Sequence, residues 1–297
     1  MAVPDVDVAA LQLFLSEFLS ADLRLNRLNG GDESAVFLAE TPSQRLVVRV
    51  ALEAEGYRKD SLVANWLAGT AVPVPAVLRI GAWGGFHVCI TEYIDGDTVQ
   101  SLDAEGLSPV VRSVAETLQD LRRFSPPVPD SAGPLDSEGR CRFRSWPEYL
   151  AESTSAARQT RWGDSLNPKA WMLVARLSEL APDRRGLVHG DFGSNNLLTD
   201  GKRITGVLDW SEAMIGDPLY DVANQFFWRT WLACMEAQAR LFEEDDQFCL
   251  SERDMALVHA YQLHIGLRQL LAYQKADDQQ MCTWTVGRIN QLLSSAS

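Results

Sequence analysis

Residues 187–210 read LVHGDFGSNNLLTDGKRITGVLDW, and this stretch is the most informative about the fold. Short apolar runs, typical of β-strands, interrupt a mainly helical region here and enclose a polar loop. Asp191 and Asn196 lie in that loop, and Asp209 lies at the end of the last run. The pattern therefore predicts one rigid unit that holds two carboxylates and an amide close together.

These three side chains suit phosphoryl transfer from a nucleotide. The reaction needs oxygen ligands for Mg²⁺, which Asn196 and Asp209 could supply, and a group such as Asp191 that orients the attacking hydroxyl. The spacing from Asp191 to Asn196 is that of the kinase loop H-R-D-x-x-x-x-N, and Asp209 follows one strand later, where a metal-binding aspartate is expected. His189 is expected to support the loop backbone. The alternative is that all are ordinary loop-forming residues.

The amino-acid composition indicates which classes of molecule the chain can bind. The chain has 297 residues, a net charge of -13 and a pI near 4.8. This charge argues against a nucleic-acid partner, because phosphate backbones demand clustered Lys and Arg, and it favours a cationic substrate. Five cysteines without C-x-x-C spacing indicate neither a disulfide framework nor a zinc site. No signal peptide and no long apolar run are seen, so we expect a cytoplasmic monomer with no membrane contact.

The hydrophobic periodicity changes along the chain. Short β-type runs dominate up to residue 94 and helical spacing dominates beyond it, so we expect lobes at residues 1–94 and 95–297. The strands are predicted at 36–38, 46–50, 76–80 and 87–93. The helices are predicted at 6–19, 56–69, 108–124, 146–158, 168–181, 218–243, 252–273 and 280–293, with a Pro-rich loop at 125–134.

The segments LVHGDFGSNN, VLDWSEA and GDPLYDVAN resemble the signature of the aminoglycoside phosphotransferase family, a branch of the protein-kinase-like fold. The similarity extends over about residues 25–273. It implies an α+β bilobal fold with a small antiparallel-sheet lobe and a larger helical lobe. It also implies transfer of the γ-phosphate of ATP or GTP to a hydroxyl of a cationic aminoglycoside, with Mg²⁺ as cofactor.

The resemblance also implies roles for single positions. Asp191 is the expected catalytic aspartate, and Asn196 with Asp209 would hold Mg²⁺. The strand residue that contacts the nucleotide phosphates falls on Arg49, and its ion-pair partner falls on Asp60. Most kinases use lysine at the first of these positions. Arginine keeps the charge but has a planar fork, so a different contact geometry is expected.

Other residues of the first lobe are expected to surround the nucleotide. A glycine-containing turn would cover the phosphates, with Ser34 and backbone N–H groups near Gly31 as donors, although a plain β-turn is the alternative. Glu92 and Ile94 would form the hinge that pairs with the purine edge. Three apolar side chains are candidates for contact with the purine ring, with ordinary core packing as the alternative: Ile80, Val48 and Leu198.

Carboxylates of the second lobe are expected to receive substrate ammonium groups. Glu212, and either Glu236 or Glu148, are the candidates, in addition to Asp191 itself. Asp217 and Asp221 would support the catalytic loop from the start of a helix.

Two other functions remain open at this point. The chain could be a kinase of another small hydroxyl compound such as choline, homoserine or an amino sugar, because the catalytic loop is shared. It could instead be a non-catalytic nucleotide-binding module, for which Arg49 and the incomplete glycine loop argue.

Overall fold

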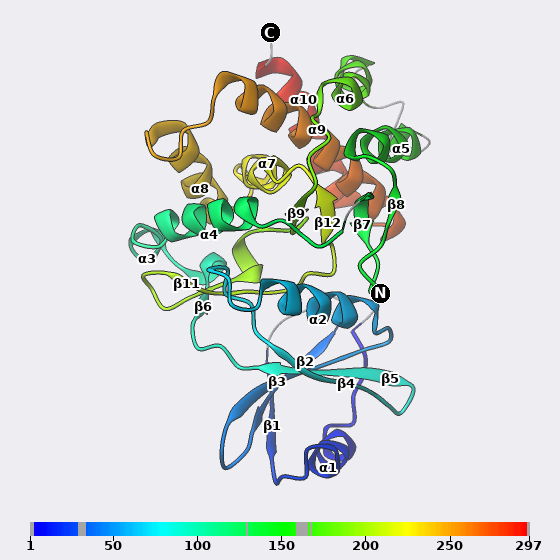
Figure 1. The fold of residues 1–297 in the computed structure, drawn as a ribbon, viewed down its shortest axis with the longest axis vertical. Coiled ribbons are helices and arrows are strands. Elements are labelled where there is room, and N and C mark those ends of the chain that lie inside the picture. The colour runs from blue at the N-terminus through cyan, green and yellow to red at the C-terminus, as the bar shows by residue number, and fades with distance from the viewer. Residues whose placement is uncertain (1–2, 29–33, 129, 159–165, 167, 296–297) are drawn as a thin grey trace.

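The computed structural model describes residues 3–28, 34–128, 130–158, 166 and 168–295, and these form two lobes (Figure 1). The first lobe is a five-stranded antiparallel sheet in the order β1-β2-β3-β5-β4. Its elements are α1 (Val8–Leu19), β1 (Arg24–Arg27), β2 (Ala35–Glu40), β3 (Arg45–Ala51), α2 (Glu55–Leu67), β4 (Val77–Trp83) and β5 (Phe86–Glu92).

Strand alternation gives the sheet two different faces. Leu46, Val48 and Val50 of β3 are buried in a cluster with Leu11 and Leu15 of α1. Successive side chains of a strand point to opposite faces, so the arginine between Val48 and Val50 points the other way. The prediction that Val48 contacts the purine ring is therefore wrong, because it packs under α1.

The second lobe is mainly helical. Its helices are α3 (Ala104–Leu107), α4 (Val111–Arg123), α5 (Trp146–Arg158), α6 (Pro168–Leu180), α7 (Leu219–Trp228), α8 (Ala233–Glu244), α9 (Glu252–Lys275) and α10 (Gln279–Ser295), with 3₁₀ turns η1 (Val99–Ser101) and η3 (Ser194–Asn196). Its strands are β6 (Asp97–Thr98), β7 (Ala132–Leu135), β8 (Cys141–Phe143), β9 (Gly186–Val188), β10 (Leu197–Thr199), β11 (Ile204–Val207) and β12 (Met214–Gly216). In the part of the chain that the structure describes, no helix is long and apolar enough to cross a membrane.

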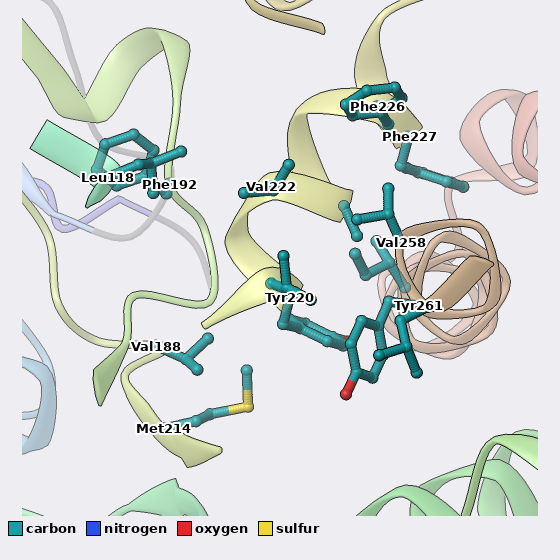
Figure 2. Close-up of a cluster of buried hydrophobic side chains, with 14 of the residues drawn as sticks. Leu118, Val188, Phe192, Met214, Tyr220, Val222, Phe226, Phe227, Val258 and Tyr261 are labelled. Carbon is teal, nitrogen blue, oxygen red and sulfur yellow. The ribbon is translucent and has the colours of Figure 1, made fainter. Parts of the chain in front are cut away.

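The core of this lobe forms between α7 and α9. Figure 2 shows Tyr220 and Phe227 of α7 facing Val258 and Tyr261 of α9. Phe192, the residue after the predicted catalytic aspartate, is fully buried in the same cluster. The core therefore anchors the loop that carries the chemistry.

The predicted helix at 218–243 is wrong. The structure has two helices, α7 and α8, separated by a short turn in which Leu232 is extended. Neither Gly nor Pro marks the break.

Tertiary contacts explain the break. The indoles of Trp228 and Trp284 stack with centroids 5.0 Å apart, and Trp231 packs edge-on against Trp284 at 5.2 Å. Arg229 forms an ion pair with Glu236 of α8 at 2.6 Å. A continuous helix would carry Trp231 and Arg229 away from these partners.

A buried histidine links three helices of this lobe. The His264 ring nitrogens lie 2.5 Å from Ser153 Oγ and 2.9 Å from Tyr220 Oη, and the side chain has no exposed surface. Burial, and then the positive charge of Arg268, lower the pKa of His264 to about 3. The folded protein therefore keeps this imidazole neutral, whereas the unfolded chain protonates it below pH about 6.5.

We predict acid destabilisation from this group. Its stabilising contribution is complete above pH about 6.5 and is lost as the pH falls towards 3, so the free energy of unfolding should drop by about 2 kcal/mol between pH about 7.5 and about 5 on its account. His264→Gln should flatten that slope in urea unfolding experiments. An unchanged slope in the variant would contradict the assignment.

Candidate functional site

The loop after β9 is fixed by Asp221 of α7. The Asp221 carboxylate is fully buried and accepts hydrogen bonds from His189 N at 2.8 Å and Gly190 N at 2.9 Å. Burial raises the pKa of Asp221 to about 7, against the lowering effect of these two bonds. Gly190 has φ +85°, and a Cβ there would lie 2.3 Å from the carbonyl oxygen of Glu212, so the loop passes very close to that backbone.

His189 supports the loop from below. Its Nε2 lies 2.9 Å from the Leu208 carbonyl oxygen, and its Nδ1 accepts a hydrogen bond from Asp191 N at 3.3 Å. Burial lowers the pKa of His189 to about 4, and the ring packs on Trp210 at 4.5 Å. A neutral imidazole with both nitrogens occupied does not transfer protons, so its role in this structure is the predicted support of the backbone.

Asp191 and Asn196 are in direct contact. Asn196 Nδ2 donates to the backbone oxygen of Asp191 at 3.1 Å and to Asp191 Oδ2 at 2.9 Å. Asn196 O accepts from Leu208 N at 2.8 Å, and this bond brings the end of β11 and the following Asp209 beside the loop. Among the described residues, no donor reaches Asn196 Oδ1, which leaves that oxygen available to a ligand.

Asp209 adopts an unusual backbone conformation for a non-glycine residue. Its φ is +58°, in the left-handed region that Asp and Asn tolerate best. Asp209 Oδ1 accepts from Ser211 N at 3.2 Å, and the side chain is exposed. The turn therefore presents the carboxylate to solvent beside Asp191, an arrangement whose strain is common at functional sites.

Asp191 has an altered acidity. Its side chain is open to solvent, yet dense protein around it removes much of its hydration. This desolvation, followed by the negative charge of Asp209, raises the pKa of Asp191 to about 6, while the Asn196 hydrogen bond opposes the rise. The group is therefore mostly ionised at neutral pH and close to the range useful for proton transfer.

The donor set fits a magnesium ion that is shared with a nucleotide. Over residues 3–28, 34–128, 130–158, 166 and 168–295, no group of three or more His, Cys, Asp or Glu side chains could hold a metal alone. Mg²⁺ usually takes only one or two protein oxygens and completes its shell with phosphates and water. Asn196 Oδ1 and the Asp209 carboxylate meet that requirement.

The predicted pair in the first lobe is present. Arg49 and Asp60 form a hydrogen-bonded ion pair, and both side chains are largely buried. Asp60 Oδ1 also accepts from Trp210 N at 2.7 Å, and Trp210 follows Asp209 directly in the chain. The Arg49 guanidinium lies 4.9 Å over the Tyr57 ring, a contact that sequence reasoning missed because it joins a strand to a helix.

The other expected nucleotide contacts are located in part. Ser34 Oγ lies 3.1 Å from Tyr57 Oη, next to the Arg49 pair, whereas Gly31 lies outside the described residues. Glu92 uses its side chain to accept from Ala76 N at 3.1 Å. Sheet pairing stops after Glu92, and in the described chain the backbone N–H and C=O of Ile94 have no partner.

Two of the acids predicted to bind substrate differ in availability. Glu212 accepts one hydrogen bond from Arg268 at 2.8 Å and is about half exposed, so part of the carboxylate remains free beside the catalytic loop. Glu236 is held by Arg229 and Arg240, each at 2.6 Å, which balances its charge. Arg268 was missed, because it lies 56 residues from Glu212 in the chain.

A scan against protein-family models matches residues 24–255 to the phosphotransferase enzyme family, which is most of the chain. The chain belongs to this family. It is 36% identical to hygromycin-B 4-O-kinase from Escherichia coli over an alignment that covers 100% of this chain and 88% of that enzyme. The stretches FGSNN, DWSEAM and WLACME already resemble hygromycin B 4-O-phosphotransferase in particular, and this comparison confirms that resemblance.

Solved structures of the phosphotransferase family agree with the fold. A thermostable mutant of aminoglycoside phosphotransferase APH(4)-Ia, in ternary complex with AMP-PNP and hygromycin B, has a TM-score of 0.85, 34% identity, and coverage of 97% of this chain and 99% of that one. A putative fructosamine-3-kinase from Haemophilus somnus 129PT, with TM-score 0.62, 18% identity, and coverage of 96% and 97%, shares the fold.

The APH(4)-Ia complexes share a residue spacing with this site. Three of them carry single alanine substitutions, one at an aspartate and the others at asparagines four and five positions further along. Asp191, Asn195 and Asn196 have the same spacing here.

The support from Asp221 yields a prediction. Asp221→Ala leaves two buried N–H groups without partners, so it should destabilise the protein by about 2 kcal/mol or more and reduce turnover strongly. Asp221→Asn keeps one acceptor oxygen and should lose less. Thermal unfolding and turnover measured on both variants check this, and an Asp221→Ala protein as stable and active as the wild type would contradict it.

Proposed function

We propose that this phosphotransferase is an aminoglycoside kinase that transfers the γ-phosphoryl group of ATP, or GTP, to a hydroxyl of hygromycin B and so inactivates the antibiotic. The observation that carries the proposal is the unit of Asp191, Asn196 and the turn at Asp209, in a chain similar along its whole length to a hygromycin-B kinase. Resistance to the antibiotic is the expected consequence for the host.

Each residue of the site has a separate role in the proposed reaction. Asp191, ionised at neutral pH, accepts a hydrogen bond from the attacking hydroxyl and aligns it with the γ-phosphorus. Asn196 fixes the Asp191 rotamer through its amide and, with Asp209, would hold Mg²⁺. When bound, the ion would supply positive charge that stabilises the phosphoryl oxygens. Arg49, oriented by Asp60, binds the nucleotide phosphates from the opposite lobe.

The substrate class follows from charge. A cationic aminoglycoside suits a protein of net charge -13, and the free part of the Glu212 carboxylate, next to Gly190, is the best-placed group for a substrate ammonium. Glu236 would act through its arginine partners or after exchange of one of them. We assign the protein to the cytoplasm, where nucleotide triphosphates are available, as a monomer.

Two alternatives have weaker support. A kinase of choline, homoserine or an amino sugar would use the same catalytic unit with a different substrate surface. A non-catalytic nucleotide-binding module would not need Asp191, Asn196 and Asp209 to be assembled together.

Growth of a sensitive host that expresses the chain tests the proposal. Hosts should survive on hygromycin B and not on aminoglycosides of other scaffolds, and a host that expresses Asp191→Asn should die. If the host expresses the chain in soluble form and yet survives on no aminoglycoside, the proposal is contradicted and the other acceptors are favoured.

The role of Asp191 gives a quantitative prediction. Loss of a positioned base costs about 10²–10⁴ in rate, so Asp191→Asn should lower the turnover number by that range. Its nucleotide affinity, measured by titration without acceptor, should change little. Wild-type turnover in the variant would remove Asp191 from the mechanism.

A further inference from the structure

Helix α2 carries Asp60 and packs largely against the second lobe. Val63 and Leu67 of α2 are buried in the cluster that forms the core of that lobe. Only Tyr57 joins a small cluster on the sheet, with Ala51 and Cys89. Figure 1 shows α2 lying between the five-stranded sheet and the rest of the molecule. The helix therefore takes its position from the catalytic lobe.

A tight turn between β7 and β8 meets this helix. Asp136 orders the turn, because its carboxylate accepts from Glu138 N and Arg140 N, both at 2.9 Å, and its C=O accepts from Gly139 N at 3.1 Å. Gly139 has φ +76°, and a Cβ built there would lie 3.1 Å from the ring of Trp66 in α2. The turn therefore lies directly against the helix.

Glu55 makes the polar contact between the two elements. It is the first residue of α2, and its Oε1 accepts a hydrogen bond from Ser137 N of the turn at 2.9 Å. The preceding Ala54 provides no side-chain cap, and the Glu55 hydrogen bond joins the first turn of the helix to the other lobe. The contact borders an open cavity of about 390 Å³, which Glu55 and Asp136 help to line.

The same helix makes two more bonds to the catalytic lobe. Lys59 Nζ donates to Ser211 O at 2.9 Å, and Asp60 accepts from Trp210 N. Glu55 therefore fixes the first turn of a helix whose next turn holds Asp60 against both Arg49 and the segment after Asp209.

We propose that Glu55 is a positioning residue for nucleotide binding: its bond to Ser137 N holds α2 in the orientation in which Asp60 presents Arg49 to the nucleotide phosphates. Kinases in general bind nucleotide productively only when the helix that carries the acidic partner is correctly placed. In this protein the turn at residues 136–140 holds helix α2 in that position through the hydrogen bond from Ser137 N to Glu55. The inference rests on the proposed function only in taking Arg49 as a phosphate contact.

Nucleotide affinity without acceptor tests the proposal on the full chain. Glu55→Ala should weaken binding of a fluorescent ATP analogue by about tenfold or more, the effect of one hydrogen bond to a charged group. Glu55→Gln keeps an acceptor oxygen and should bind within about twofold of the wild type. Affinity for hygromycin B alone should not change in either variant, which separates a positioning role from general damage.

A second variant removes the donor instead of the acceptor. Asp136 accepts from Gly139 N, so Ser137 is the second residue of a β-turn, where proline is favoured. Ser137→Pro should preserve the turn, remove the N–H and weaken nucleotide binding as Glu55→Ala does. Both changes together should weaken it no further, because they break the same bond.

Glu138→Ala is the matched control. Glu138 lies in the same turn, and among the described residues its carboxylate pairs only with Arg140, so its loss should leave nucleotide affinity unchanged. The proposal is overturned if Glu55→Ala or Ser137→Pro binds nucleotide like the wild type, or if Glu55→Gln loses as much affinity as Glu55→Ala. Absence of antibiotic phosphorylation would refute the proposed acceptor and leave these affinities interpretable.

Discussion

The carboxylate of Asp60 joins the two halves of the site. One oxygen pairs with Arg49 on the central strand of the sheet, and the other accepts the backbone N–H of Trp210, one residue after Asp209. Both contacts lie in a largely buried region, where breaking one half of an ion pair is costly. The spacing between the nucleotide side and the metal side of the site therefore depends on this one side chain.

The catalytic lobe adds a second rigid layer. Asp221 and His189 are buried and bond only to the loop and its neighbours, so the loop backbone is fixed before any substrate arrives. Asp191 and Asp209 are exposed, and Asn196 is hydrogen-bonded to Asp191. The buried groups thus fix the backbone of the loop, and the exposed groups remain available to bind ligands. Phosphoryl transfer needs such a preorganised site.

Local sequence signals predicted most of this arrangement. The spacing of Asp191 and Asn196 is fixed by the short loop, and the hairpin of β10 and β11 returns the chain to Asp209. The pairing of Arg49 with Asp60 followed from the family resemblance, and the structure contains it. Helices such as α5, at Trp146–Arg158, carry their own apolar spacing and were predicted at those bounds.

Long-range contacts account for what the sequence did not predict. The break between α7 and α8 depends on packing with Trp284, and the fixation of Glu212 depends on Arg268, both distant in the chain. The Val48 prediction failed because it ignored the alternation that brings Arg49 to the site. Glu55 lies in no sequence motif that could have identified it, because its partner is the backbone N–H of Ser137 in the other lobe.

The most direct measurement of the central claim is nucleotide affinity in Asp60→Asn. Asparagine can still accept from Trp210 N, but it removes the charge that orients Arg49. Loss of a hydrogen bond between charged groups predicts that the variant, while folded, binds nucleotide at least about tenfold more weakly than the wild type. A folded Asp60→Asn protein with unchanged nucleotide affinity would contradict the account, because the two lobes would then not be coupled through this carboxylate.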